Sequence, residues 1–248
     1  MATMTINVAG NPIIPCGSAV NAGGNIGVYE LILNVGSGLG YTGIRYNSLS
    51  IPDRFQLYYN NSLVADTKFV GDGITSTSPT GGITPGTYIL NNFDYNGTAF
   101  VADGTTTSVT INTTDISNIT TEPSDGNGVL LFNKTTASPT TVRVVIIGSP
   151  ASGTTSWNLT AICPTPEEDL IDGEEKIIYK FFNETDKALQ TTSAKFILVA
   201  SENKFYTDVL GGTTFSNYGY VAIRDYINDG VNWWRISATG NIIDTGLL

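Results

Sequence analysis

Aspartate side chains are the first groups to consider for chemistry, because the chain contains no histidine. Glycoside hydrolysis needs two Asp or Glu side chains on either side of a cleft. The candidates are Asp53, Asp66, Asp72 and Asp94, which all fall at predicted strand ends or turns. Aspartate is common at such positions because it hydrogen-bonds the backbone. Without histidine there is no Ser-His-Asp triad and no base partner for a cysteine. We therefore predict a non-enzymatic protein with no catalytic residues and no cofactor.

Three acidic turns offer oxygen ligands of the kind that Ca²⁺ prefers. They lie at residues 70–73, 124–128 and 228–230. None has the spacing of an EF-hand loop. Hairpin turns without metal are the favoured interpretation, and a structural Ca²⁺ is the alternative. Zinc is excluded because the chain lacks histidine and a second pair of cysteines.

Two pairs of adjacent aromatic residues are candidates for stacking on a sugar ring. They are Tyr58-Tyr59 and Trp233-Trp234, each on a predicted strand. Neighbouring side chains on a strand point to opposite faces, so one ring of each pair is expected to be exposed. Large aromatic residues on strands are more often core or interface anchors. We favour that role and keep sugar stacking as the alternative.

The chain has two cysteines, Cys16 and Cys163. A disulfide between them would join the first and last strands of one domain. Closing so long a loop contributes about 4–5 kcal/mol in the chain-entropy model. Two buried thiols are the other interpretation, since synthesis in a cytoplasm disfavours oxidation and an extracellular destination favours it. The sequence is compatible with both a disulfide and two free thiols.

The elements that position these residues are predicted from alternating apolar segments rich in β-branched and aromatic side chains. Asn-Gly, Asp-Gly and Asn-Asn turn signals separate them at intervals of about ten residues, which is typical of a sandwich or jelly roll. Residues 71–86 are predicted to form an exposed loop. The predicted strands of the first domain are 5–8, 28–35, 44–49, 54–59, 63–70, 87–90, 99–102, 108–112, 128–133, 141–147 and 155–163.

The composition changes at Pro164, which predicts two domains. Residues 1–163 form a jelly-roll-like antiparallel sandwich, and residues 164–175 form an acidic, Pro-containing linker. Residues 176–248 are expected to form a small, mostly β domain with a hairpin around Asn228-Asp229-Gly230. Because this domain is small, we expect it to oligomerise or dock. Its expected core is Tyr179, Phe181, Phe196, Phe205, Phe215, Tyr218 and Tyr220.

Charge and hydropathy narrow the classes of partner. The net charge is −10 and only 14% of residues are charged, whereas nucleic-acid binding needs clustered Lys and Arg. The longest aliphatic run, residues 144–147, is far too short to span a membrane. The first residues lack the basic and apolar regions of a signal peptide, so we expect synthesis in a cytoplasm without export. Nucleic-acid binding and membrane insertion are not expected.

Six short motifs together resemble a β-sandwich domain common in Bacteroidota and their tailed phages. The resemblance covers most of residues 16–164. The motifs are PDRF (52–55), VADTKFVG (64–71), LFNK (131–134), VRVVIIGSP (142–150), GTTSW (153–157) and CP (163–164).

The resemblance implies a virion structural protein similar to the head-fibre, decoration or tail-fibre proteins of such phages, including crAss-like ones. It implies assembly with other capsid or tail proteins, a homo-oligomer such as a trimer, location in the virion, and host surface glycans as potential ligands. Residues 165–248 carry no such resemblance. The alternative function is a carbohydrate-binding module of a cell-surface adhesin.

Overall fold

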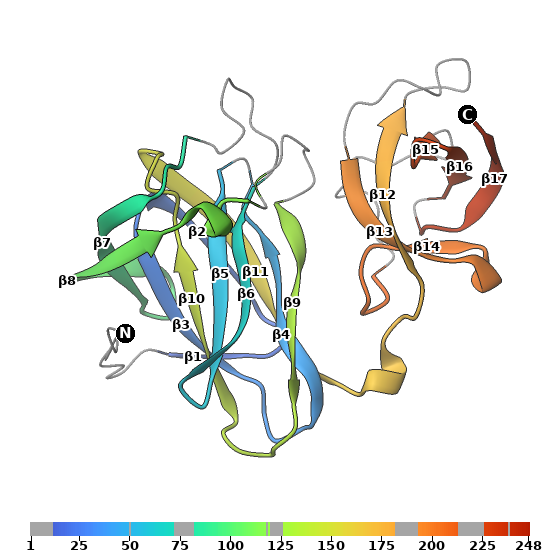
Figure 1. Cartoon of the computed structure of the whole chain (residues 1–248). Helices are drawn as coiled ribbons and strands as arrows, with labels where there is room; N and C mark the ends of the chain where they lie inside the picture. Colours follow the sequence, from blue (N-terminus) through green and yellow to red (C-terminus); the bar gives the residue numbers. More distant parts are fainter. Residues whose placement is uncertain are drawn as a thin grey trace.

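The structure is a computed structural model that describes residues 12–49, 51–71, 82–117, 119, 126–181, 193–212, 226–237 and 239–248. For residues 177–181 and 193–195 it describes the backbone alone. The described elements are β-strands joined by turns and single 3₁₀ turns, arranged as two β domains (Figure 1). The predicted all-β fold, a sandwich followed by a small β domain, is confirmed.

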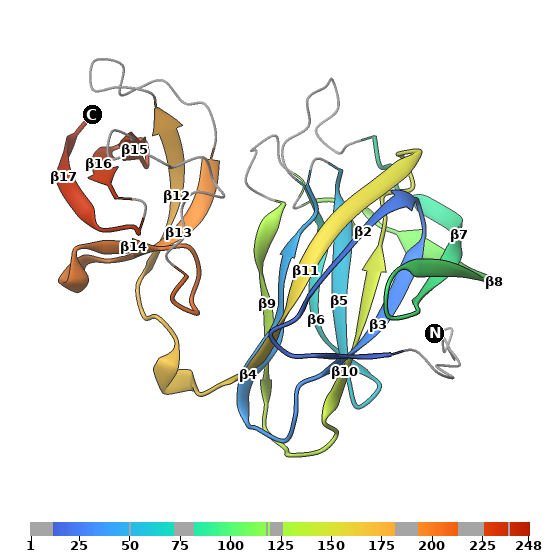
Figure 2. The ribbon, with the colours of Figure 1, turned by 180° about the vertical axis from the view of Figure 1, so that it is seen from behind.

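The N-terminal domain is a jelly roll. Its eight defining strands form two antiparallel sheets, and successive strands alternate between them except at the β5–β6 hairpin, as in other jelly rolls. Figures 1 and 2 show the two sheets one behind the other. The four-stranded sheet has the order β2 (Ala19–Asn25), β11 (Thr154–Thr165), β4 (Gly40–Asn47), β9 (Asn127–Lys134). The larger sheet has the order β6 (Ser62–Val70), β5 (Asp53–Tyr59), β10 (Thr141–Ile147), β3 (Val28–Asn34).

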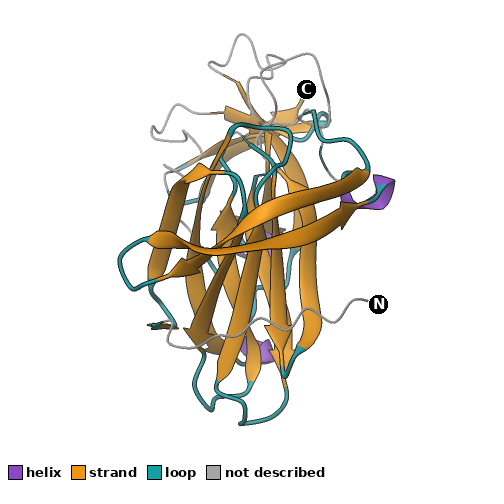
Figure 3. Ribbon diagram, turned by 90° about the vertical axis from the view of Figure 1, so that its left-hand side faces the viewer, coloured by secondary structure: helices purple, strands orange, loops and turns teal. Residues whose placement is uncertain are grey.

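Three further strands extend the larger sheet beyond β3. The short strand β1 (Ile13–Pro15) and strand β7 (Gly86–Tyr95) both pair with β3 in parallel, and β8 (Phe100–Ile111) pairs with β7. Figure 3 views the molecule from the side on which the β7–β8 hairpin lies. The sequence predicted two strands where β8 is continuous, because Asp103-Gly104 resembles a turn. In the structure these residues form a bulge opposite β7, with Gly104 at φ +82°.

The main core lies between the two sheets and is centred on Trp157 of β11. This side chain is 1% exposed, and Tyr29, Phe55 and Phe100 contact it edge to face with ring centroids 5.6, 6.3 and 5.3 Å away. Such pairs add to the free energy gained from burial alone. Phe93 and Phe132 also belong to this core, and its aliphatic residues come from both sheets, among them Val20, Leu31, Leu33, Ile44, Leu57, Val142, Val144, Ile146 and Leu159.

A second core covers the outer face of the larger sheet. Val28, Phe69, Val145 and Ile147 point away from the main core and pack against apolar residues of the segment 82–119. Strands β3, β5 and β10 are therefore buried on both faces. Two-sided burial explains why residues 144–147 are continuously apolar and do not alternate. The covering residues are Ile83, Leu90, Val109, Ile111 and Ile119.

A disulfide between Cys16 and Cys163 joins the two sheets. Cys16 follows β1 of the larger sheet, and Cys163 lies in β11 of the other; their Cα atoms are 4.9 Å apart. The backbone N–H of Cys16 donates to the carbonyl of Asn34 at 3.0 Å, which places the first cysteine at the end of β3. The jelly-roll topology thus brings together two residues that are 147 positions apart.

The connection between the domains differs from the predicted linker at 164–175. Strand β11 continues to Thr165, which pairs with Tyr41, and a 3₁₀ turn, η2 (Glu167–Asp169), follows. Ile171 then packs against the C-terminal domain beside Tyr206 and Val209. Ile171 is therefore docked on the C-terminal domain, whereas the acidic side chains of the segment are exposed. A bidentate ion pair between Arg45 and Asp208, at 2.8 and 3.1 Å, also crosses from one domain to the other.

The C-terminal domain is a small closed barrel. The hydrogen bonds Phe205 N–H to Gly240 O (2.8 Å) and Ile242 N–H to Asn203 O (3.0 Å) close the sheet between its first and last strands. Among the expected core residues, Phe196 and Phe205 are buried, and Trp234 joins them; Tyr179, Phe181, Phe215, Tyr218 and Tyr220 lie outside the described side chains. The strand order is β14 (Lys204–Tyr206), β13 (Ser193–Val199), β12 (Glu174–Phe181), β15 (Tyr226–Asn228), β16 (Asn232–Ile236), β17 (Ile242–Leu247).

Replacing both Cys16 and Cys163 with serine should lower the free energy of unfolding by about 4–5 kcal/mol, since the cross-link removes the entropy of a very long loop from the unfolded chain. Denaturant unfolding with and without reductant measures this. Reductant should bring the wild type down to the stability of the double variant and leave the variant unchanged. Alkylation of both cysteines in unfolded, unreduced protein would contradict the disulfide.

Candidate functional site

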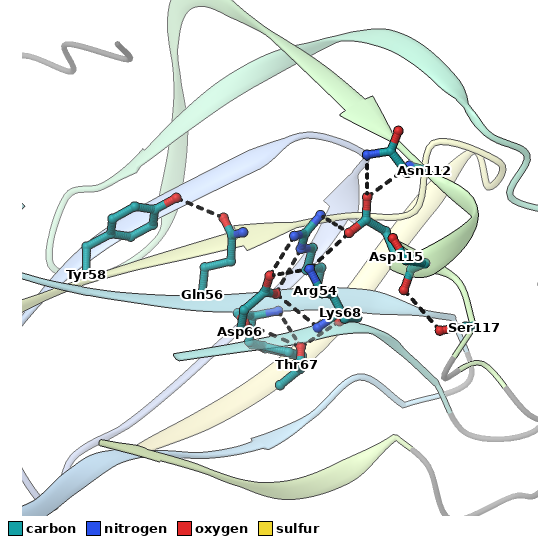
Figure 4. A network of polar contacts seen from close by, with 11 residues as sticks. Arg54, Gln56, Tyr58, Asp66, Thr67, Lys68, Asn112, Asp115 and Ser117 are labelled. Carbon is teal, nitrogen blue, oxygen red and sulfur yellow. Dashed lines mark hydrogen bonds and ion pairs between the residues drawn. The ribbon is translucent and has the colours of Figure 1, made fainter. Parts of the chain in front are cut away.

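An ion-pair cluster lies on the outer face of β5 and β6 and includes one of the four candidate aspartates (Figure 4). Arg54 donates two hydrogen bonds to the carboxylate of Asp66, at 2.9 and 2.6 Å. A third guanidinium nitrogen of Arg54 lies 3.2 Å from Asp115. The Lys68 ammonium is 3.1 Å from both carboxylates. We call Arg54, Asp66, Lys68 and Asp115 the Arg54 cluster.

A β-bulge in β6 aims Lys68 into the cluster. The register between β5 and β6 shifts between Arg54 and Gln56, and Lys68 adopts the left-handed conformation at φ +60°. The Thr67 hydroxyl accepts the Phe55 N–H at 2.9 Å in the place of a ladder bond. A bulge commonly redirects a side chain in this way.

Asp115 reaches the cluster from η1 (Thr113–Asp115), a 3₁₀ turn in the segment that covers the larger sheet. Its carboxylate also accepts the backbone N–H of Asn112 at 2.9 Å, which fixes the start of that turn. The ion pairs with Arg54 and Lys68 therefore fasten the covering segment to β5 and β6.

The cluster keeps its carboxylates ionised. Partial burial raises the pKa of Asp66, but hydrogen bonds from Arg54 and from the Lys68 backbone N–H outweigh it and hold the pKa at about 2. Burial also opposes ionisation of Asp115, yet the Asn112 N–H and the two cations lower its pKa below the ordinary value. A carboxylate held ionised by bidentate arginine is a poor proton donor or base near neutral pH. The arrangement is suited to holding the structure together.

Arg54 lies on the face that alternation along β5 predicts, whereas Asp53 does not have the role expected from the sequence. Alternation places Arg54 on the outer face, where it does lie, but the covering segment buries it to 8% exposure. Asp53 was expected to cap a turn. It is instead fully buried and accepts a hydrogen bond of 2.5 Å from the Thr155 hydroxyl of the opposite sheet. Burial raises the pKa of Asp53 well above its ordinary value.

Among the candidate aspartates that the structure describes, Asp53, Asp66 and Asp94, no two are paired with each other. Asp53 contacts Thr155 and Asp66 contacts Arg54, so these two aspartates belong to separate sets of interactions. Asp94 is half-buried on β7. Asp72 lies outside the described residues.

The tyrosine pair is engaged in contacts within the jelly roll. The Arg143 guanidinium lies 4.1 Å from the ring centroid of Tyr58, whose hydroxyl donates to Gln56 at 3.2 Å. Tyr59 packs against Phe132 with ring centroids 5.2 Å apart and donates its hydroxyl to the Pro139 carbonyl at 3.0 Å. Both rings are half-buried and neither forms a free platform.

The tryptophan pair overturns the expectation of one exposed ring. Trp233 and Trp234 are each 7% exposed. They do point to opposite faces of β16: Trp234 packs against Phe205 inside the barrel, and Trp233 packs against Tyr226. Alternation along a strand predicts which face each side chain points to, but it does not predict that both faces of the strand are covered. Sugar stacking on these rings is therefore not supported.

The acidic turn at Asn228-Asp229-Gly230 uses its oxygens internally. The Asp229 carboxylate accepts the backbone N–H groups of Val231 and Asn232 at 3.0 and 2.7 Å. Burial raises the pKa of Asp229, but these two hydrogen bonds have the larger effect, so its pKa lies below the ordinary value. Of the other two turns, residues 72–73 and 124–125 lie outside the described part. Within the described residues no group of three or more Asp, Glu or Cys side chains is placed to hold a metal ion.

A pocket at the edge of the sandwich is a feature that the sequence analysis missed. It has a volume of about 210 Å³ and lies between residues 21–25 of β2 and residues 98–100 at the turn of the β7–β8 hairpin. Tyr29 and Phe93 also line it. The signal that could have indicated it is the sequence Asn21-Ala-Gly-Gly-Asn25, in which two adjacent glycines lie between two asparagines.

Comparisons with family models, with curated proteins and with solved structures found no match to this chain. The assignment of the jelly roll therefore rests on the observed strand order. In the described residues no helix has the length and apolar character needed to cross a bilayer.

Replacing Asp66 with asparagine should lower the free energy of unfolding by about 3 kcal/mol at neutral pH, which corresponds to a pKa of about 2 in the folded state and about 4 in the unfolded chain. Because the pKa is lowered by folding, this stabilisation is present above pH about 4 and disappears as the pH falls towards 2. The stability difference between wild type and variant should therefore shrink over that range in denaturant unfolding.

The matched control is Asp169→Asn, which changes an exposed aspartate of η2 that makes no ion pair in the described structure. The stability difference between wild type and variant isolates Asp66, because Glu30 and Asp53 are present in both proteins. Burial raises the pKa values of Glu30 and Asp53, so their contributions to the pH dependence of stability have the opposite sign. A difference that stays constant from pH 7 to pH 2 would refute this account of the Arg54 cluster.

Proposed function

We propose that this chain is a non-enzymatic structural component of a tailed-phage virion, as a head fibre, a capsid decoration or a tail-fibre module. The observation that carries the proposal is that the motifs shared with the phage-protein family all lie in the jelly-roll domain. Jelly rolls are frequent in viral capsid and lectin domains, and the motif residues lie on one such scaffold.

The motif residues act in packing and cross-linking. Asp53 bonds Thr155 between the sheets, and Arg54 holds Asp66 within the Arg54 cluster. Trp157 is the centre of the main core, and Cys163 forms the disulfide. A resemblance that lies in scaffold residues supports a shared building unit and gives no support to a shared catalytic centre.

The surface of the C-terminal barrel supports assembly with further copies or with other virion proteins. Val231, Leu247 and Leu248 are 63, 76 and 50% exposed. They are neighbours, because the Leu248 N–H donates to the Val231 carbonyl at 3.0 Å and β17 pairs with β16 beside them. Apolar side chains exposed next to one another are typical of contact surfaces. We call Val231, Leu247 and Leu248 the barrel-end patch and propose that it contributes to homo-oligomerisation.

A carbohydrate-binding adhesin module is the second candidate function. The aromatic residues first considered for it are covered, but the pocket beside β2 has an aromatic floor and an uncharged lining. That pocket is the observation that favours carbohydrate binding.

A virion protein should copurify with particles. Phage particles purified from a lysate by density gradient should contain this chain at a defined copy number when their proteins are quantified by mass spectrometry. The disulfide and the two-sided core should keep it folded during purification. Particles that lack the chain, while the lysate contains it, would overturn the virion proposal.

The double variant Val231→Ser, Leu247→Ser should weaken self-association of the purified chain. Burying each of these side chains contributes on the order of 1–2 kcal/mol, so the association constant should fall by roughly tenfold or more. Analytical ultracentrifugation measures this. Leu63→Ser changes an exposed leucine of the jelly roll and serves as the control. A monomeric wild type, or equal losses in both variants, would contradict a role for the patch.

A further inference from the structure

The floor of the pocket beside β2 is aromatic and rigid. Tyr29 and Phe93 stack with ring centroids 4.8 Å apart and an interplanar angle of 14°. Phe100 contacts Tyr29 edge to face at 5.2 Å, and Trp157 supports both from below within the main core. The Tyr29 hydroxyl donates to the Asn25 carbonyl, which ties the floor to the wall. These rings are held in place before any ligand arrives.

The wall is the unpaired edge of β2, where glycine leaves the backbone accessible. β2 pairs with β11 on one side only. Gly24 has φ +129°, and a Cβ added there would meet no atom within 4 Å. A ligand can therefore approach the backbone at this position, and a larger residue would be both strained and in its way.

The polar groups that line the pocket are neutral and unused. The side-chain amides of Asn21 and Asn25 and the hydroxyl of Thr98 make no hydrogen bond within the described part of the chain, and all three residues are exposed. No charged side chain contributes to the lining. A phosphate, a carboxylate or a metal ion would find no counter-charge here. A neutral ligand with many hydroxyl groups could use the amides and the partly exposed ring of Phe100, which Tyr29 and Phe93, at 2 and 7% exposure, support from beneath.

We propose that this pocket binds one ring of a neutral saccharide. Its volume of about 210 Å³ has room for about seven water molecules at ~30 Å³ each, which is the scale of a single sugar ring. Pockets for drug-sized ligands are larger, at about 300–1,000 Å³. The exposed rim allows a longer glycan to continue into solvent. The inference rests on the second candidate function and names the ligand class of its pocket. It is independent of the virion role, since particle association and saccharide binding can each fail without the other.

The test is titration of ¹⁵N-labelled full chain with the methyl glycosides of glucose, galactose, mannose, fucose and N-acetylglucosamine, followed by NMR. At least one should shift the amide signals of Gly23, Gly24 and Thr98, with a dissociation constant on the order of millimolar. Glucuronic acid should bind no better than glucose. Raising NaCl from about 0.1 M to about 1 M should not weaken binding, because no charge takes part.

The double variant Asn21→Ala, Asn25→Ala should weaken binding about three- to tenfold by removing two amide donors. Ala99→Trp, which fills the pocket from its exposed turn, should abolish it. Asn133→Ala on β9 is the matched control, an exposed strand asparagine at the opposite edge of the same sheet, and should bind as the wild type does. The proposal is overturned if no glycoside shifts these amides, or if binding survives both pocket variants.

Discussion

Burial of the larger sheet on both faces is the constraint on which the rest of this structure depends. Strands β3, β5 and β10 lie between the main core and the second core beneath the segment 82–119. Polar side chains on the outer face must therefore be paired to avoid the cost of burying a lone charge. The Arg54 cluster, and the pair of Arg143 with Glu30 at 3.0 Å, meet that requirement.

The same constraint decides where function can reside. Side chains with the chemistry for catalysis, above all Asp53 and Asp66, are committed to cross-sheet bonding and ion pairing. Two parts of the described surface bring uncommitted groups together and carry the binding proposals. One is the pocket beside β2, with its free amides, and the other is the apolar end of the C-terminal barrel. Both are suited to binding, one to a small neutral ligand and the other to a protein surface.

Local sequence signals predicted individual strands well. Strand β10 has the predicted bounds, and the predicted turn at Asn60-Asn61 joins β5 and β6, with both residues in the left-handed conformation at φ 50° and 60°. Contacts between distant segments were not predictable from local pattern. Nothing in the alternation around Arg54 indicates that Asp115 covers it, and nothing around Trp233 indicates that the barrel closes. Strands β1 and β2 were missed because they are short or rich in glycine, yet β2 forms the wall of the pocket.

Native-state hydrogen exchange, resolved by residue, tests the two-sided burial most directly. The account predicts that the slowest amides belong to β3, β5 and β10, including those of Leu31, Phe55 and Val145, because opening them requires both cores to separate. The edge strands β2 and β9 of the four-stranded sheet should exchange much faster. If β5 and β10 exchange as fast as these edge strands, the covering segment does not protect the larger sheet and the account is wrong.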